Sequence, residues 1–210
     1  MPLSVLKLGG SLFSLPDIVS RVRNLIRDHS IPQPVIVPGG GESADLVRVW
    51  SRRFLLGGEA SHWLAVDAMS LNARLLRASD AGVQLVTTRQ EVRQAAGNGR
   101  LAVFDPAAGL RLQETLAVEE RDVRLQPVLP RSWDVTSDSI AAWLAVGWNA
   151  DQLWLLKSVA ANGSDLTDLA ARGAVDPYFA TSAASLKNVF WVDLRSNTSP
   201  VPVRVSGDSE

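Results

Sequence analysis

The sequence predicts an α/β protein built from parallel β-α-β units. Short apolar runs that stop at glycine or proline alternate along the chain with longer segments of helical period. Such alternation is typical of parallel sheets, because two parallel strands need a crossover connection that is usually a helix. Two glycine clusters each follow an early strand, and ligands of open parallel sheets bind at these carboxyl ends.

The composition fits one domain, for which we expect the bounds 1–210. Of the 210 residues, 46% are hydrophobic and 20% are charged, which is ordinary for a globular chain. The chain has no cysteine, which excludes disulfides and thiolate chemistry. Its net charge of −1 and its scattered basic residues argue against a nucleic-acid partner. The first residues are too glycine-interrupted for a signal peptide, and no apolar run approaches the ~20 residues that span a bilayer. We therefore expect a cytoplasmic protein without a membrane partner.

The hydrophobic periodicity and the positions of glycine and proline predict the individual elements. Strands are expected at Leu3–Leu8, at the run PVIVP, and at Val83–Thr87, Leu101–Phe104, Gln152–Leu156 and Phe190–Leu194. Helices are expected at Asp17–His29, Glu42–Leu56, Glu59–Ala78 and Ser137–Val146. The final segment RSNTSPVPVRVSGDSE is expected to hold a last short strand and a polar tail.

The segment KLGGS, Lys7 to Ser11, ends the first expected strand. Gly9 and Gly10 have no side chain, so backbone N–H groups there can approach an anion closely, as a phosphate site requires. Lys7 would add a positive charge. The alternative is a plain turn after the strand with a snorkelling lysine. The loop is not of the G-x-x-x-x-G-K-[ST] type.

The segment PGGGESAD, Pro38 to Asp45, follows the second expected strand and opens a helix. Three consecutive glycines, Gly39 to Gly41, reduce the stability of the fold, because glycine loses much backbone entropy on folding. At a helix N-terminus they leave unobstructed N–H donors and a positive dipole end for a phosphate. One glycine turn would be structural, but two glycine loops after two successive strands favour a phosphate site.

Asp138 lies in the first turn of the helix that follows WDVTS. Its carboxylate could reach Lys7 and hold it in place. Capping is the alternative for both Asp134 and Asp138. Thr136 and Ser137 offer hydroxyls either to a substrate or to the cap of the same helix.

The segment LWLLKSVAANGSD places Lys157 at the end of a strand and then turns through Asn162 and Gly163. Phosphoryl transfer needs cations on the migrating group more than it needs a covalent nucleophile. Lys7 and Lys157 are the lysines best placed for this, and Lys187 is a third candidate for which simple solvation is the alternative.

The remaining polar residues carry weaker signals. His62 is a lone helical histidine, and such residues are more often structural than catalytic. Asp67 on the same helix could face an acceptor group, with a solvated or capping role as the alternative. No cluster of histidines or carboxylates indicates a permanent metal. The absence of G-x-S-x-G and G-x-G-x-x-G argues against hydrolase and dinucleotide-binding folds.

The order KLGGSL, VIVPGGG and DVTSDSIAAWLA resembles the amino acid kinase superfamily, over roughly Val5 to Gly163. That resemblance implies an open, mainly parallel sheet sandwiched between helices. It also implies that about 1–130 bind the acceptor and about 131–210 form a short nucleotide-binding half. The sequence departs from larger members by its length and by LKSVAANG where they have TDVDGV. The segments HWLAVDAMSLNARLL and LPRSWDVTSDSIAAWLA look most like the [5-(aminomethyl)furan-3-yl]methyl phosphate kinases of methanofuran biosynthesis and their bacterial relatives.

The resemblance also implies roles for individual residues. Lys7 matches the lysine that stabilises the transferring phosphoryl group, and Asp138 matches the aspartate that orients the lysines. Lys157 is our interpretation of the second catalytic lysine. The loop residues divide into a phosphate and nucleotide set of Gly9, Gly10, Ser11, Lys157, Asn162 and Gly163, and an acceptor set of Gly39, Gly40, Gly41, Asp67, Thr136 and Ser137.

The function implied is transfer of the ATP γ-phosphoryl group to a small phosphate monoester, with Mg²⁺ arriving on the nucleotide. A phosphate acceptor is already ionised at neutral pH and needs no general base. The alternatives are another small acceptor, of the uridylate or isopentenyl phosphate type, and a nucleotide- or oxyanion-binding protein without turnover. Members of the superfamily are commonly oligomers, so the resemblance also implies a homo-oligomer.

Overall fold

A computed structural model describes residues 2–119, 129–161, 163 and 165–204. Its described part contains a seven-stranded sheet in the order β3-β4-β2-β1-β5-β6-β7, in which the last pair is antiparallel and the other pairs are parallel. The strands are β1 Ser4–Leu8, β2 Pro34–Pro38, β3 Val83–Val86, β4 Leu101–Phe104, β5 Gln152–Lys157, β6 Val189–Asp193 and β7 Val201–Val203. Every expected strand is confirmed, including the last short one.

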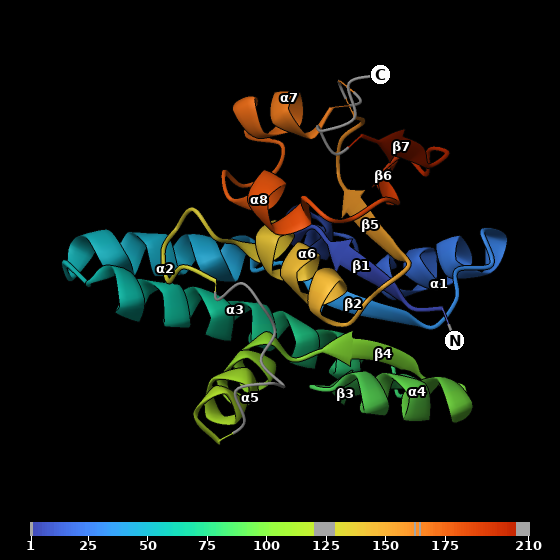
Figure 1. The fold of residues 1–210 in the computed structure, drawn as a ribbon, viewed down its shortest axis with the longest axis horizontal. Coiled ribbons are helices and arrows are strands. Elements are labelled where there is room, and N and C mark those ends of the chain that lie inside the picture. The colour runs from blue at the N-terminus through green and yellow to red at the C-terminus, as the bar shows by residue number, and fades with distance from the viewer. Residues whose placement is uncertain (1, 120–128, 162, 164, 205–210) are drawn as a thin grey trace.

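Helices cover both faces of this sheet (Figure 1). They are the 3₁₀ helix η1 Gly10–Ser14 and α1 Ile18–Asp28, α2 Gly41–Arg53, α3 Gly58–Ser79, α4 Arg89–Gly97, α5 Pro106–Glu119, α6 Ser137–Gly147, α7 Leu166–Ala171 and α8 Phe179–Ala183. The expected helices correspond to α1, α2, α3 and α6. The other helices were not expected, and none of the helices within the described ranges is long and apolar enough to span a membrane.

The core is divided between the two faces of the sheet. One cluster joins α6 and α8 to residues such as Val5 and Leu155, and the other joins α1 to residues such as Leu6 and Leu156. This division follows from the strand period of two, which sends neighbouring side chains to opposite faces. The fold is therefore a three-layer arrangement of helix, sheet and helix, as the sequence predicted.

The strand order places the candidate residues at one edge of the sheet. The chain adds β2 on one side of β1 and later returns to add β5 on the other side, so the order reverses at β1. Crevices outside the carboxyl ends of strands at such a reversal are the usual ligand sites of open parallel sheets. Lys7 lies beside Leu155 of β5 near this edge, and Lys157 is the last residue of β5.

Candidate functional site

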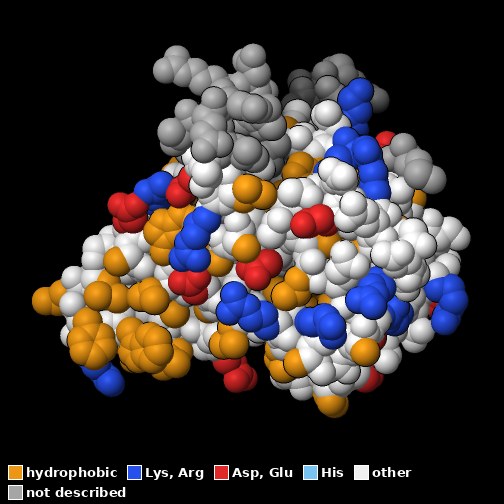
Figure 2. Space-filling view, turned by 90° about the horizontal axis from the view of Figure 1, so that it is seen from below, with side chains coloured by type: hydrophobic (Ala, Val, Ile, Leu, Met, Phe, Trp, Pro, Cys, Tyr) orange, Lys and Arg blue, Asp and Glu red, His pale blue; other side chains and the backbone are white. Residues whose placement is uncertain are grey.

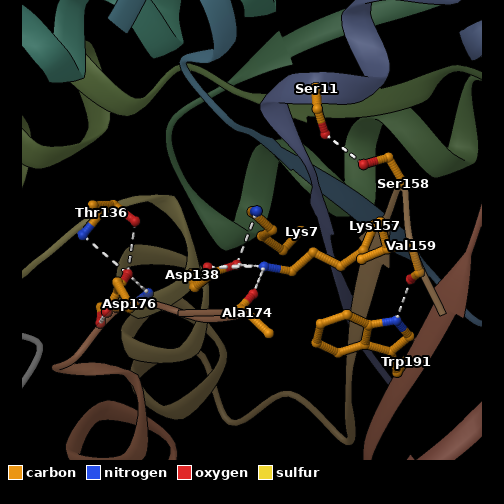
Figure 3. Close-up of polar contacts among 11 residues, drawn as sticks. Lys7, Ser11, Thr136, Asp138, Lys157, Ser158, Val159, Ala174, Asp176 and Trp191 are labelled. Carbon is orange, nitrogen blue, oxygen red and sulfur yellow. Dashed lines mark hydrogen bonds and ion pairs between the residues drawn. The ribbon is translucent and has the colours of Figure 1, made fainter. Parts of the chain in front are cut away.

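Asp138 lies between two lysines that come from neighbouring strands (Figure 3). Its Oδ1 atom is 2.9 Å from Lys7 Nζ, and its Oδ2 atom accepts a hydrogen bond of 2.9 Å from Lys157 Nζ. The side chains of Lys7, Asp138 and Lys157 are only 6%, 7% and 11% exposed. Lys7 and Lys157 share the α6 face of the sheet with Val5 and Leu155, so strand alternation aims both ammonium groups at the first turn of α6.

The charges of this cluster do not cancel, because one carboxylate faces two ammonium groups. Burial acts to raise the pKa of Asp138, but Lys157 and Lys7 outweigh it and lower that pKa to about 2. Burial lowers the pKa of Lys157 to about 8, and the neighbouring charge of Lys7 adds to this while Asp138 opposes it. A buried site with surplus positive charge favours an anionic ligand, since the ligand relieves the repulsion between the lysines.

The Lys157 ammonium is fixed by further contacts. It donates a 2.7 Å hydrogen bond to the carbonyl oxygen of Ala174 and lies 5.3 Å from the centroid of the Trp191 ring. Trp191 is itself held, because its Nε1–H donates to the carbonyl oxygen of Val159 at 2.8 Å. The lysine is therefore held in position before any ligand arrives.

Asp176, from the segment between α7 and α8, caps the helix that carries Asp138. Its carboxylate accepts hydrogen bonds from Thr136 N (3.0 Å), Thr136 Oγ1 (2.8 Å), Ser139 N (3.0 Å) and Ser139 Oγ. The sequence offered Thr136 or Ser137 as the cap, and Thr136 occupies the N-cap position, but its side chain makes no capping hydrogen bond. Residues 174–176 thus contact both Lys157 and α6, a link that the sequence analysis missed.

The two glycine loops pack against each other through their backbones. A Cβ atom on Gly10 would lie 2.3 Å from Gly41 N, and one on Gly39 would lie 2.7 Å from Gly10 N. Gly41 also has a φ of +52°, which side chains disfavour. These glycines are required by the contact between the loops, in addition to any ligand they approach.

Not all of the loop N–H groups are available to a ligand. Gly9 N donates to Leu156 O and Gly39 N donates to Leu8 O, both at 2.8 Å, and these bonds extend the sheet. Gly40 is the N-cap of α2 and makes no side-chain capping hydrogen bond, so the N–H groups of the first turn of α2 have no partner within the helix. Asn72 fixes this turn, because its Nδ2 atom donates to the carbonyl oxygens of both Gly39 and Gly40 at 2.7 and 2.9 Å.

A cavity of about 150 Å³ opens beside the second glycine loop. Its wall contains Gly10, Gly40 and Gly41 on one side and the segment before α6 on another. The rest of the wall contains both apolar and polar side chains and includes residues of α2 and α3. The lining residues outside the glycine loops are Ala44, Asp45, Arg48, His62, Ala65, Val66, Met69, Ser132, Trp133, Val135, Thr136, Ser137 and Ile140.

The cavity gathers some of the acceptor residues that the sequence indicated and leaves two, Gly39 and Asp67, outside its wall. Thr136 and Ser137 line it. Asp67 does not belong to its wall and instead pairs with Arg111 at 3.3 Å, with its side chain about half exposed. Asp45 is the carboxylate in the wall, where it pairs with Arg48.

The other expected ligand residues have mixed positions. Ser11 Oγ is 2.8 Å from Ser158 Oγ, which joins the loop after β1 to the loop after β5. Gly163 lies on that second loop with a φ of +142°, and Asn162 falls outside the described residues. Within the described ranges, no cluster of three or more histidine, cysteine or acidic side chains could hold a metal ion.

His62 and Trp133 are cavity residues that the sequence analysis did not place in a site. His62 is buried, which lowers the pKa of its imidazole, although a hydrogen bond with the Ser132 backbone opposes that effect. The Arg48 guanidinium lies 5.2 Å from the centroid of the Trp133 ring. The local signal for Asn72 was a polar residue on the buried face of an amphipathic helix, whereas Asp176 had no local signal.

Comparison with known proteins adds to this geometry. Residues 2–161 match the model of the amino acid kinase family. The chain is 23% identical over 141 residues to a [5-(aminomethyl)furan-3-yl]methyl phosphate kinase of Methanocaldococcus jannaschii, covering 67% of this chain and 58% of that protein. The match thus spans less than two thirds of the length of that relative.

Two solved structures have the same fold at low sequence identity. The UMP kinase of Bacillus anthracis has a TM-score of 0.60 and 15% identity, with 97% of this chain and 100% of that chain covered. The uridylate kinase of Archaeoglobus fulgidus has a TM-score of 0.51 and 20% identity, with 80% of this chain and 70% of that chain covered.

Proposed function

Because this chain belongs to the amino acid kinase family, we propose that it transfers the γ-phosphoryl group of ATP to the phosphate of a small monoester. The acceptor that we favour is [5-(aminomethyl)furan-3-yl]methyl phosphate, the acceptor named for the relative from Methanocaldococcus jannaschii. The product would be the corresponding diphosphate. The observation that carries this proposal is the buried cluster of Lys7, Asp138 and Lys157 beside the two glycine loops.

The chemistry needs little beyond charge and alignment. An oxygen of the acceptor phosphate forms a bond to the γ-phosphorus while the bond from that phosphorus to the β–γ bridging oxygen breaks, and ADP leaves with the electron pair. Negative charge gathers on the transferred group and on the leaving oxygen, so fixed cations and N–H donors stabilise the transition state. Lys7 and Lys157 supply the cations in this proposal.

Asp138 acts through the two lysines. Its carboxylate keeps both ammonium groups at 2.9 Å, and its lowered pKa keeps it ionised at every pH at which the enzyme would work. Two ammonium groups held in advance need not be reorganised during the reaction, which is the advantage of a preorganised site.

The two halves of the chain would divide the substrates between them. We assign the acceptor to the cavity beside α2, within about 1–130, together with Thr136 and Ser137 from the start of α6. We assign the nucleotide to about 131–210, along the loop after β5 that contains Ser158 and Gly163. The transferred group would then lie between them, beside Lys7 and Lys157.

The acceptor cavity favours a small molecule. Its volume of about 150 Å³ is below the ~300–1,000 Å³ of sites for larger organic ligands. Trp133 offers an aromatic face to a planar ring. Asp45, whose exposed side chain pairs with Arg48, belongs to the cavity wall and so replaces Asp67 as the carboxylate nearest to an acceptor ammonium. No general base is required, because the acceptor phosphate is already ionised at neutral pH.

Mg²⁺ would bind with the nucleotide, since the described residues form no metal cluster of their own. When bound, the ion would supply further positive charge to the phosphates, beside the charge that Lys7 and Lys157 provide.

ADP release in a coupled assay tests the proposal directly. With Mg-ATP present, we expect the aminomethylfuran monophosphate to stimulate release more than uridylate or isopentenyl phosphate does at equal concentration. Preference for either rival would replace the acceptor but keep the reaction class. If ATP raised the melting temperature but no acceptor stimulated ADP release, the protein would be a nucleotide-binding member of the family without turnover, and the proposed activity would be wrong.

A further inference from the structure

The two groups of the cavity wall that suit an ammonium ion already contact a cation of the chain itself. Asp45 accepts a hydrogen bond from Arg48 Nη1 within an ion pair, and the same guanidinium lies 5.2 Å from the centroid of the Trp133 ring. All three residues belong to the cavity wall. A carboxylate and an aromatic face are groups that bind organic ammonium ions. Arg48 therefore makes the contacts that the amine of an acceptor would make.

The position of Arg48 on α2 separates this part of the cavity from the part that suits a phosphate. Gly41 begins the helix, where unpaired N–H groups and the positive end of the dipole favour an anion. Arg48 follows seven residues later, which at 1.5 Å per residue is about 10 Å along the helix axis. The cavity thus has one end for an anion, at the glycine loops, and one end for a cation, at Asp45 and Trp133. A molecule with a phosphate at one end and an ammonium at the other matches this arrangement.

The ion pair of Asp45 and Arg48 differs in its position from other ion pairs of the chain. Arg131 pairs with Glu59 and Glu114, on a face that includes α3 and α5 and on which Figure 2 shows acidic and basic side chains side by side. Those two glutamates do not belong to the cavity wall, whereas Asp45 does. A ligand inside the cavity can therefore reach the carboxylate that Arg48 uses.

The contacts of Arg48 are weak enough to be exchanged for those of a ligand. The side chains of Arg48 and Asp45 are 48% and 68% exposed. Exposed ion pairs contribute little, because water screens them and long side chains lose freedom when they form. A cation–π contact at an exposed site is similarly weak. An acceptor that is bound through its phosphate holds its ammonium at a high effective concentration beside Asp45, so it can replace the guanidinium, which then turns into solvent.

We propose that Arg48 occupies the ammonium position of the acceptor site, and that an acceptor with its own ammonium displaces it from Asp45 and Trp133. This inference rests on the proposed function, because it concerns the acceptor of that reaction. A phosphate monoester without a positive group leaves Arg48 paired with Asp45. Arg48 thus determines how strongly the site prefers an acceptor that carries an amine, and it takes no part in phosphoryl transfer.

Isothermal titration calorimetry without ATP tests this exchange with two probes. One is [5-(aminomethyl)furan-3-yl]methyl phosphate, and the other is the same monoester with a methyl group in place of the aminomethyl group. The selectivity of a variant is the dissociation constant of the methyl monoester divided by that of the amine monoester. Arg48→Met keeps an apolar stem and removes the charge. The amine monoester should then bind about three- to tenfold more tightly, and the selectivity should rise by a similar factor.

Three further variants control for the carboxylate, the charge and the position. Asp45→Asn removes the carboxylate and should bring the selectivity close to one. Arg48→Lys keeps a cation that can reach Asp45, so its selectivity should stay closer to that of the wild type than Arg48→Met does. Arg52→Met makes the same charge change on the same helix but outside the cavity wall, and should leave both dissociation constants unchanged. Circular dichroism verifies that each variant is folded.

The outcomes distinguish this role of Arg48 from others. If Arg48→Met weakened both monoesters by the same factor, Arg48 would be a contact of the phosphate and the proposal would be wrong. An unchanged selectivity, or a wild type that does not bind the amine monoester, would also overturn it. The measurement involves no turnover. A chain that releases no ADP can therefore still pass this test, and an active kinase for a different acceptor can fail it.

Discussion

The buried cluster is supported in different ways on its two sides. On the amino-terminal side, the loops after β1 and β2 pack backbone against backbone, with Gly10 and Gly41 too close for any side chain between them. On the carboxyl-terminal side, side-chain hydrogen bonds support the cluster, since the Asp176 carboxylate caps α6. The first arrangement tolerates no added atom, whereas the second tolerates changes that keep the hydrogen bonds. The two sides should therefore respond differently to substitution.

The largest effect should come from the cluster that both sides support. Lys7→Ala removes one of two cations from the transferred group, and losing one such stabilising group commonly lowers turnover ~10²–10³-fold. Asp138 keeps its contact with Lys157, so the fold and the melting temperature should change little. Steady-state ADP release and thermal melting measure the two quantities. Lys187→Ala, an exposed lysine before β6, is the control and should be fully active; near-normal turnover in Lys7→Ala would remove Lys7 from the mechanism.

The backbone-packed side should fail on addition of a single methyl group. Gly10→Ala places a Cβ atom 2.3 Å from Gly41 N, so the loops must separate, at a cost of about 3 kcal/mol in the free energy of unfolding. Gly97→Ala is the matched control, because a Cβ atom there meets nothing within 4 Å and the residue ends a helix. Denaturant unfolding of both variants measures the difference. Equal stability of the two variants would mean that the loops are not packed in this way.

A substitution on the side supported by side chains should lower the free energy of unfolding less. Asp176→Ala leaves the start of α6 without its cap, which should lower the free energy of unfolding by about 2 kcal/mol. Turnover should fall about tenfold, because α6 carries Asp138. Asp176→Asn keeps one acceptor oxygen and should recover part of both losses. A simple loss of folded protein would not move the pH profile, so a shifted alkaline limb in Asp176→Ala would identify a positioning role; an unchanged limb with normal turnover would refute that role.

The pH dependence should separate the function of Lys157 from its effect on stability. With a pKa of about 8 in the folded protein, Lys157 loses its charge above that pH, and kcat/KM should fall about tenfold per pH unit. Lys157→Arg does not titrate in this range and should have no such limb. An unchanged limb in this variant would assign the titration to another group.

The stability contributed by the same lysine should change in the opposite direction. Between pH about 8 and 10.5 the unfolded chain holds this proton more tightly than the folded chain does, so the free energy of unfolding rises with pH. Chemical denaturation of the wild type and of Lys157→Met across this window isolates the effect. The free energy of unfolding of the wild type minus that of the variant should rise with pH, and a fall would contradict the lowered pKa.

The smallest effect should come from Asp67. Its side chain pairs with Arg111 and does not belong to the cavity wall, whereas Asp45 does. Asp67→Asn should change KM for the acceptor less than twofold, whereas Asp45→Asn in the cavity wall should raise it by more. Michaelis constants for both variants decide between them, and a large effect at Asp67 would restore it as an acceptor contact.

The sequence predicted the strands, the glycine loops and the aspartate on α6, because each has a local signature. Buried strands are apolar runs, glycine repeats are visible as letters, and Asp138 lies in the first turn of a helix with a clear start. Asp176 could not be predicted in this way. It caps a helix that begins about 40 residues earlier in the chain, and only the folded arrangement brings the two together. The short helices α7 and α8 were missed for a similar reason, since they depend on packing more than on period.

The packing of the glycine loops also explains more of the glycine pattern than phosphate binding does. Gly9 and Gly39 use their N–H groups in the sheet, so their presence in a phosphate-like motif is partly structural. From sequence alone these two uses of glycine cannot be separated, because both require the same absence of a side chain.

The placement of β1 in the middle of the sheet has a consequence for the order of folding. Contacts at the site join residues that are far apart in sequence, by 147 positions for Ser11 and Ser158 and by 181 for Ser14 and Arg195. Contacts of such long range close only after the intervening chain has been ordered, which slows folding. The strand that carries Lys7 is synthesised long before its neighbour β5. A growing chain therefore lacks the proposed phosphate site until both β1 and β5 have been made.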